Sequence, residues 1–167
     1  AATEYGAQSV NGMSGSKRSG QFANSAMVVQ IRDDDVPGDG PFKMLSFIEG
    51  VERNAFIPGF RAPAERMLDF TEDRKKLSLI RTTYPCGAEP RRLDDILPPA
   101  VAGSLRTAFR KFGAMTDGRF LTNDALMLGV ETRTSSPVRI LRDGQMRQGR
   151  GLYPAGEGAG YAGGIVS

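Results

Sequence analysis

The sequence predicts an α+β fold with a mixed or antiparallel sheet and two main helices. Apolar residues recur at helical spacing in two segments, 41–56 and 98–112, a pattern typical of helices that pack one face on a core. Two consecutive strand-like runs, 125–134 and 138–141, precede a hairpin signal at 143–144. The 167 residues are 40% apolar, which is enough for the core of one domain with an added piece.

The first third of the chain is expected to contain a strand, an acidic loop and the first helix. Residues 8–14 indicate a short strand or turn, and 22–31 a strand whose β-branched end suggests burial on both faces. Residues 33–40 are turn-rich and acidic, but their carboxylates lack the EF-hand spacing, so we expect a solvated loop and no metal site. The following helix begins near Pro41 and ends before Pro58-Gly59. Its apolar positions are Leu45, Ile48, Val51 and Ala55.

The middle of the chain leads to the second helix. Residues 62–70 are expected to form a loop with a short helix, and 71–92 an extended crossing segment with one strand-like run at 77–80. A helical turn at 93–97 precedes the second helix, which begins at Pro98-Pro99. Its predicted docking face comprises Val101, Leu105, Ala108, Phe109 and Phe112, and its opposite face Arg106, Arg110 and Lys111.

Composition excludes several functional classes. The formal net charge is only +3 and the basic clusters are scattered among acids, which argues against a nucleic-acid footprint. The chain contains no histidine, so imidazole acid–base chemistry and histidine metal sites are absent. Its one cysteine, Cys86, excludes an internal disulfide and a CxxC zinc site; we expect an unreactive turn cysteine in a reducing compartment, the cytoplasm. No apolar run reaches the ~20 residues of a membrane span.

The segment 151–167 carries the most informative pattern. An apolar run leads into one carboxylate, Glu157, and six glycines lie between residues 151 and 164. That order suits a strand edge whose acid meets a sugar hydroxyl and whose bare backbone approaches a phosphate. Disordered glycine-rich tails look similar, so the residues alone leave nucleotide binding and a plain tail open.

Two further groups of polar residues stand out. In residues 129–140, hydroxyls, two arginines and an acid crowd a strand junction, where Glu131, Arg133 and Ser135 would share one face of a strand. They suit either a cross-strand ion pair or arginines facing an anionic substrate or a reduced cofactor ring. The second group is 10–14 with Asn24-Ser25, which turn chemistry explains as well as ligand binding does.

Taken in order, these motifs resemble a known family. The resemblance rests on Val10-Asn-Gly-Met-Ser14 with 24–29, Ala62-Pro-Ala-Glu-Arg66 with Asp69-Phe70, Leu97-Pro-Pro99, Gly129–Arg139 and Gly151–Ile165. Together they resemble the carboxy-terminal half of a bacterial family of uncharacterised FAD-dependent dehydrogenases, two-domain flavoproteins. In that family a Rossmann unit with a GxGxxG fingerprint precedes an inserted α+β domain, and the chain then returns to the FAD domain.

The resemblance implies a domain division and a set of site residues. Residues 1–150 would be the inserted cap or substrate domain, and 151–167 the returning strand and glycine-rich segment of the FAD-binding domain. The implied FAD-binding residues are Gly156, Glu157, Gly158, Gly160, Gly163, Gly164 and Ile165. Arg133, Ser135, Ser136 and Arg139 would line the flavin-facing substrate cleft. No catalytic residue is implied, and the substrate is a small molecule of unknown identity.

The resemblance also implies that the isolated chain and its parent protein differ in activity. The Rossmann unit with the dinucleotide fingerprint is expected to lie outside the 167 residues, and both ends are expected to be cut from a longer protein. We therefore expect the parent protein to be an FAD-dependent oxidoreductase, and the isolated chain to be inactive and to retain no FAD. The alternative function is a non-catalytic ligand- or protein-binding module that uses the glycine-rich loop for phosphate. Nucleic acid and membranes are not expected partners.

Overall fold

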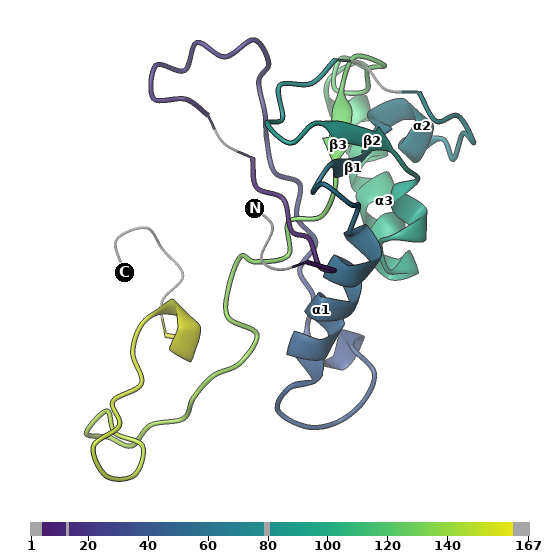
Figure 1. Cartoon of the computed structure of the whole chain (residues 1–167). Coiled ribbons are helices and arrows are strands. Elements are labelled where there is room, and N and C mark those ends of the chain that lie inside the picture. The colour runs from purple at the N-terminus through teal and green to yellow at the C-terminus, as the bar shows by residue number, and fades with distance from the viewer. Residues whose placement is uncertain (1–4, 13, 79–80, 162–167) are drawn as a thin grey trace. The chain divides into compact units, whose positions relative to one another are not determined.

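The computed structural model describes residues 5–12, 14–78 and 81–161 (Figure 1). It confirms an α+β fold with a small mixed sheet and two main helices. In chain order the elements are η1 (Asp33–Asp35), α1 (Lys43–Ala55), β1 (Ala62–Arg66), α2 (Met67–Thr71), β2 (Ala88–Pro90), η2 (Leu93–Asp95), α3 (Pro99–Met115), β3 (Leu126–Leu128) and η3 (Glu157–Ala159).

The chain divides into two compact units, which are described separately. Unit 1 comprises Ala1–Gln30 and Val51–Glu131, and unit 2 comprises Ile31–Gly50 and Thr132–Ser167. The sheet, α2 and α3 all belong to unit 1, whereas the glycine-rich loop belongs to unit 2. The division expected from the resemblance, at residue 150, stays a prediction about the parent protein.

The sheet of unit 1 has the order β2-β1-β3. β1 pairs in parallel with β2, with Ala62 opposite Ala88, and antiparallel with β3, with Glu65 opposite Met127. The expectation of a loop at 62–66 is therefore wrong, although the short helix predicted behind it is present as α2. Pro63 is tolerated in this central strand because it lies beyond the last β1–β3 pair, Ala64 with Leu128, where no ladder N–H is needed.

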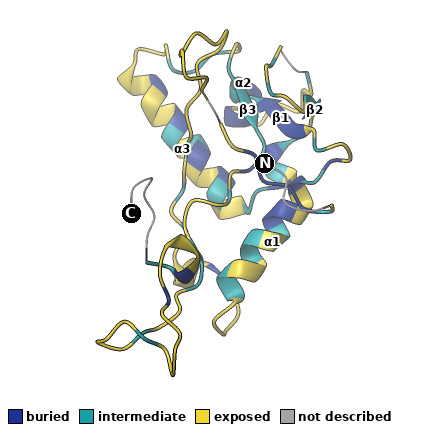
Figure 2. Ribbon diagram, turned by 60° about the vertical axis from the view of Figure 1, so that its left-hand side comes forward, coloured by how far each residue is buried: buried dark blue, intermediate teal, exposed yellow. Residues whose placement is uncertain are grey.

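Both predicted helices form close to their expected bounds. α3 begins with proline at its first position and buries Ala102, Leu105, Phe109 and Gly113, one face of a 3.6-residue repeat (Figure 2). Phe109 is 1% exposed, and its ring meets the buried Phe70 ring edge-on at a centroid distance of 6.1 Å. α1 buries Val51, Glu52 and Ala55. The predicted docking face of α3 extends too far, since Phe112 is 36% exposed.

One predicted strand is absent from the described residues, and another is shorter than expected. Residues 22–31 run without strand pairing and are mostly exposed, with Val28 72% exposed. Of 125–134 only Leu126–Leu128 pairs, and the chain then turns away at Gly129, whose φ is +23°. A Cβ at Gly129 would lie 3.2 Å from both Pro63 and Val10, so the turn depends on close packing.

The segment 138–141 is also not a strand, and the same-face argument for Glu131, Arg133 and Ser135 loses its basis. The predicted turn at 143–144 is confirmed: the Asp143 N–H donates to the Arg147 carbonyl at 2.7 Å. Beyond it, Gln148 and Leu152 form an isolated antiparallel bridge. Of the strand-like run 77–80, residues 79 and 80 lie outside the described residues, and 77 and 78 are not in a strand.

The remaining predictions concern the loops at residues 93–97, around Cys86 and at 33–40, and each of these loops contains a turn or a short 3-10 helix. The helical turn predicted at 93–97 is present as η2. Cys86 is exposed in a turn closed by the Gly87 N–H on the Tyr84 carbonyl at 2.9 Å. In the acidic loop, η1 is closed by the Asp35 carboxylate, which accepts the Arg32 N–H at 2.8 Å. Asp33 forms an ion pair with Lys43 at 2.8 Å.

Candidate functional site

The glycine-rich loop of unit 2 folds around a short 3-10 helix, η3. Gly156 enters it with φ +77° and Gly160 leaves it with φ +81°, conformations that glycine adopts without strain. The Gly160 N–H donates to the Glu157 carbonyl at 2.8 Å and the Tyr161 N–H to the Gly156 carbonyl at 3.0 Å. The loop is therefore closed on itself by its own backbone.

The loop packs on the serine–arginine segment that the resemblance placed in the substrate cleft. Ser136 Oγ donates to the Gly158 carbonyl at 3.3 Å, and Arg139 Nε donates to the Gly160 carbonyl at 3.1 Å. The Ile140 N–H donates to the Ala159 carbonyl at 3.2 Å. Two sets of residues predicted separately from the sequence, the glycines and the Ser136–Arg139 segment, thus meet in one unit.

Three glycines of the predicted FAD site lie among the described residues. They differ in how much free space surrounds the position that a Cβ would occupy. A Cβ at Gly156 or Gly158 would meet nothing within 4 Å, whereas one at Gly160 would lie 2.8 Å from the Val138 carbonyl oxygen. The backbone at 156 and 158 is therefore open on the side where a side chain would lie. At 160, glycine is required by packing within the chain itself.

The other predicted site residues are placed as follows. The side chain of Glu157 is exposed, and within the described residues it forms no hydrogen bond or ion pair. Arg133 and Ser135 are also exposed. Gly163, Gly164 and Ile165 lie outside the described residues.

Two residues beside the loop escaped the sequence analysis, Arg142 and Tyr161. The guanidinium carbon of Arg142 lies 3.6 Å from the centroid of the Tyr161 ring, and that of Arg139 lies 5.1 Å from it. Arg142 Nη1 also donates to the Pro154 carbonyl at 2.9 Å, and the Tyr161 hydroxyl to the Ile140 carbonyl at 2.9 Å. Tyr161, an aromatic residue within the glycine-rich segment, was the one signal in the sequence that could have indicated this group of two arginines and a tyrosine.

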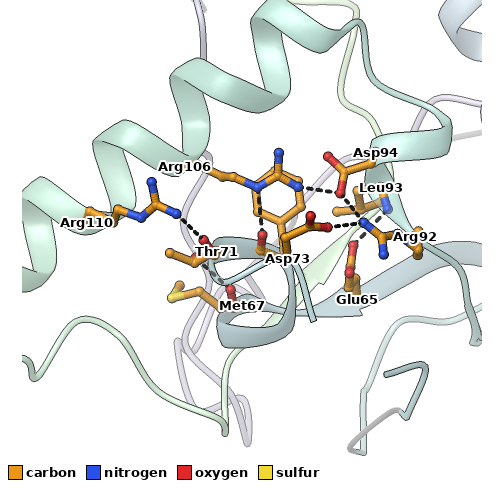
Figure 3. Close-up of polar contacts among 10 residues, drawn as sticks. Glu65, Met67, Thr71, Asp73, Arg92, Leu93, Asp94, Arg106 and Arg110 are labelled. Carbon is orange, nitrogen blue, oxygen red and sulfur yellow. Dashed lines mark hydrogen bonds and ion pairs between the residues drawn. The ribbon is translucent and has the colours of Figure 1, made fainter. Parts of the chain in front are cut away.

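Unit 1 holds a second polar cluster, centred on Glu65 of β1 (Figure 3). Glu65 is 2% exposed; its Oε2 accepts the Leu93 N–H at 2.8 Å, while its Oε1 is buried and has no hydrogen-bond partner among the described residues. Burial raises the pKa of this carboxyl above 4.5, and the charge of Asp94 raises it further. The Leu93 hydrogen bond and the Arg92 and Arg106 charges oppose that rise of the pKa.

Around Glu65, arginines join α2 to α3 and η2 (Figure 3). Arg106 of α3 donates through Nε to the Phe70 carbonyl at 2.9 Å, lies over the Phe70 ring and forms an ion pair with Asp94. Arg92 pairs with both Asp94 and Asp73, and its hydrogen bond lowers the pKa of Asp73. Arg110 Nη2 donates to the Thr71 carbonyl at 2.9 Å.

These contacts satisfy the carbonyl end of α2 and are structural in character. They also correct the expected polar face of α3. Two of its members, Arg106 and Arg110, bind backbone carbonyls of α2, so that this face is partly a packing surface. Sequence periodicity marks a charged helix position but does not show whether its guanidinium finds a buried acceptor.

The described residues contain neither a membrane-spanning helix nor a metal-binding cluster. No helix in that part of the chain is long and apolar enough to cross a membrane. No group of three or more His, Cys, Asp or Glu side chains there is arranged to hold a metal ion.

The fold and the loop define a class: an α+β domain that carries a glycine-rich loop with open backbone at Gly156 and Gly158. Residues 1–134 match the family model described as "FAD-dependent protein, C-terminal domain-like", and the chain belongs to this family. An uncharacterized protein of Clostridium beijerinckii is 39% identical over 174 aligned positions, which cover 100% of the chain. The chain spans 32% of the length of that relative.

Proposed function

We propose that the chain is the substrate-side domain of an FAD-dependent oxidoreductase of the dehydrogenase type, and that its glycine-rich loop forms one wall of the FAD site. Family membership supports FAD as the cofactor of the parent protein. The observation that carries the assignment to this loop is the open backbone at Gly156 and Gly158, beside a segment that presents Ser136 and Arg139.

In this proposal the residues of the chain bind and orient. Gly156 and Gly158 admit the cofactor backbone, and the Glu157 carboxylate accepts a hydrogen bond from a cofactor hydroxyl. Ser136 and Arg139, with Arg133 and Ser135, face the substrate. Gly163, Gly164 and Ile165 would lie near the flavin. FAD, when bound, supplies the electron-accepting ring that takes hydride from the substrate.

The proposal extends to partners and compartment. The substrate is a small molecule, and neither nucleic acid nor a membrane is a partner, since the net charge of +3 is spread over the chain. The single cysteine agrees with a cytoplasmic protein.

The test uses the intact protein that contains this chain. We expect it to show flavin absorbance, as purified or after FAD is added, and Glu157→Ala to weaken FAD binding by about 1–3 kcal/mol, the value of a lost charged hydrogen bond. Calorimetric titration of the apoprotein with FAD measures this. Asp39→Ala removes another exposed acid of unit 2 and is the matched control. An intact protein without flavin absorbance in excess FAD contradicts the proposed function.

A further inference from the structure

We propose that Arg139 and Arg142, oriented by Tyr161, form an oxyanion-binding clamp beside the glycine-rich loop. We call these three residues the arginine clamp. The inference deepens the proposed function and rests on it in one respect: the clamp adjoins the loop assigned to FAD. It adds Arg142 and Tyr161 to the site and names the chemistry of the bound group, a phosphate or carboxylate.

The geometry of the clamp is set by backbone contacts on both sides of the loop. Arg142 Nη1 donates a hydrogen bond to the carbonyl of Pro154, which precedes η3. Arg139 Nε donates one to the carbonyl of Gly160, which follows η3. The guanidinium group has five N–H donors. Because each arginine uses one for its hydrogen bond to a backbone carbonyl, four N–H donors remain for a ligand. Tyr161, held through its hydroxyl by the Ile140 carbonyl, supplies the ring on which both groups rest.

The charges of the clamp are not balanced by acids. Within the described residues, neither Arg139 nor Arg142 forms an ion pair with a carboxylate. The nearest acid along the chain, Asp143, is engaged by the N–H groups of Gln145 and Arg147 and pairs with the Arg147 guanidinium. Two like charges held at one aromatic ring repel each other, and an anion bound between or beside them removes that cost.

The chemistry of the donors selects the ligand class. Guanidinium forks match the paired oxygens of phosphate and carboxylate and form charge-assisted hydrogen bonds with them. Two sources of such a group fit the position of the clamp: the pyrophosphate of the cofactor and an anionic group on the substrate. A neutral substrate would leave the clamp without a ligand.

The experiment uses the intact apoprotein and two probes, inorganic phosphate and FAD, each titrated calorimetrically at constant ionic strength so that screening does not change. The variants are Arg139→Gln, Arg142→Gln and Arg142→Lys. Arg142→Lys keeps the positive charge but removes the planar guanidinium group with its paired N–H donors. Arg150→Gln removes an exposed arginine of the same unit outside the clamp and is the control.

We expect phosphate binding to weaken roughly tenfold or more in either glutamine variant and less in the lysine variant, with Arg150→Gln unchanged. A parallel loss of FAD affinity assigns the clamp to the cofactor pyrophosphate; unchanged FAD affinity assigns it to an anionic substrate group. Phosphate and FAD affinities that are both unchanged in the glutamine variants overturn the clamp, while FAD binding by the wild type leaves the proposed function intact. Conversely, phosphate binding without FAD binding keeps the clamp and rejects the proposed function.

A measurement on the wild type keeps the inference testable if a variant fails to fold. Phenylglyoxal modifies exposed arginines, and mass spectrometry reads each site. We expect phosphate to protect Arg139 and Arg142 but not Arg150. Equal modification of all three with and without phosphate overturns the clamp.

Discussion

Glu65 shows how much one residue depends on its surroundings. In the sequence it is an ordinary acid in an Ala-Pro-Ala-Glu-Arg run, yet it lies on the central strand of the sheet with one carboxylate oxygen unpartnered. Burial favours the neutral form of a carboxyl because the charged form loses its hydration. An oxygen without a hydrogen-bond partner is less costly to bury on a protonated carboxyl than on a carboxylate.

The first prediction concerns Glu65→Gln. The pKa of Glu65 is raised in the folded state, so the folded protein binds more protons than the unfolded chain above about pH 4.5, and its stability falls as the pH rises from there through the folded pKa. Glutamine keeps the acceptor for the Leu93 N–H and does not titrate. We therefore expect the variant to match the wild type near pH 4.5 and to exceed it at pH 8, by roughly 1.4 kcal/mol for each unit of pKa shift.

Chemical denaturation at a series of pH values measures this difference. Glu89→Gln, on the neighbouring strand, is the matched control, because its side chain is 42% exposed and pairs with Arg61. If the difference between the wild type and Glu65→Gln stays constant from pH 4.5 to 8, Glu65 does not titrate as described.

The second prediction separates two glycines of the loop. Gly160 has a φ of +81° and a Cβ there would meet the Val138 carbonyl oxygen at 2.8 Å, whereas a Cβ at Gly158 meets nothing within 4 Å. Gly160→Ala is therefore expected to destabilise the loop by ~1–3 kcal/mol, and Gly158→Ala to leave it folded. Under the proposed function, Gly158→Ala still weakens FAD binding, since the methyl group faces the cofactor.

Hydrogen exchange of the amides of residues 157–161 measures the stability of the loop, and titration of the intact apoprotein with FAD measures the FAD affinity. Faster exchange in Gly158→Ala than in Gly160→Ala would contradict the packing argument.

At the scale of elements, both main helices were predicted, whereas β3 was the one strand that lay within a predicted strand among the described residues. The spacing of Leu105 and Phe109 repeats within one helix, so the sequence contains the whole signal for α3. A strand, by contrast, exists only through its partners. Residues 22–31 have a strand-like composition without a partner, while β1 contains a proline and is central to the sheet.

The third prediction tests the connection between α2 and α3. Arg106→Ala leaves the Phe70 carbonyl and Asp94 without this donor and uncovers the Phe70 ring, so we expect a loss of about 1–3 kcal/mol in the free energy of unfolding. Lys111→Ala, an exposed position on the same helix, is expected to change it by less than about 0.5 kcal/mol. Urea denaturation compares the two, and equal effects would show that Arg106 is dispensable.

At the scale of the whole molecule, the proposed function makes the candidate site one part of a larger FAD site. The chain spans 32% of the length of its relative from Clostridium beijerinckii, and under the proposed function the Rossmann unit with its GxGxxG fingerprint belongs to the rest of the parent protein. Such a fingerprint places backbone N–H groups and a helix N-terminus at the cofactor pyrophosphate. Under the proposed function the glycine-rich loop supplies one wall of the FAD site and does not supply that anchor.

The fourth prediction follows from that division. We expect the isolated 167 residues to bind FAD at least roughly a hundredfold more weakly than the intact apoprotein, because the anchoring contacts to the pyrophosphate are lost. Equilibrium dialysis with FAD compares the two proteins, and circular dichroism of the isolated chain shows whether it is folded. Equal affinities would mean that the loop and clamp hold the cofactor alone.

Sequence by itself determined the α+β class, the two main helices, the turns at Cys86 and Asp143, and the glycines and arginine around which the candidate site is built. These properties are local: helical periodicity, turn chemistry and backbone freedom are written within a few consecutive residues. Only the tertiary structure decided that β1 is the central strand, that Glu65 is buried with one oxygen unpartnered, and that Arg139 and Arg142 share Tyr161. Each of these depends on residues distant in sequence, and pairing, desolvation and charge proximity arise only when the chain brings them together.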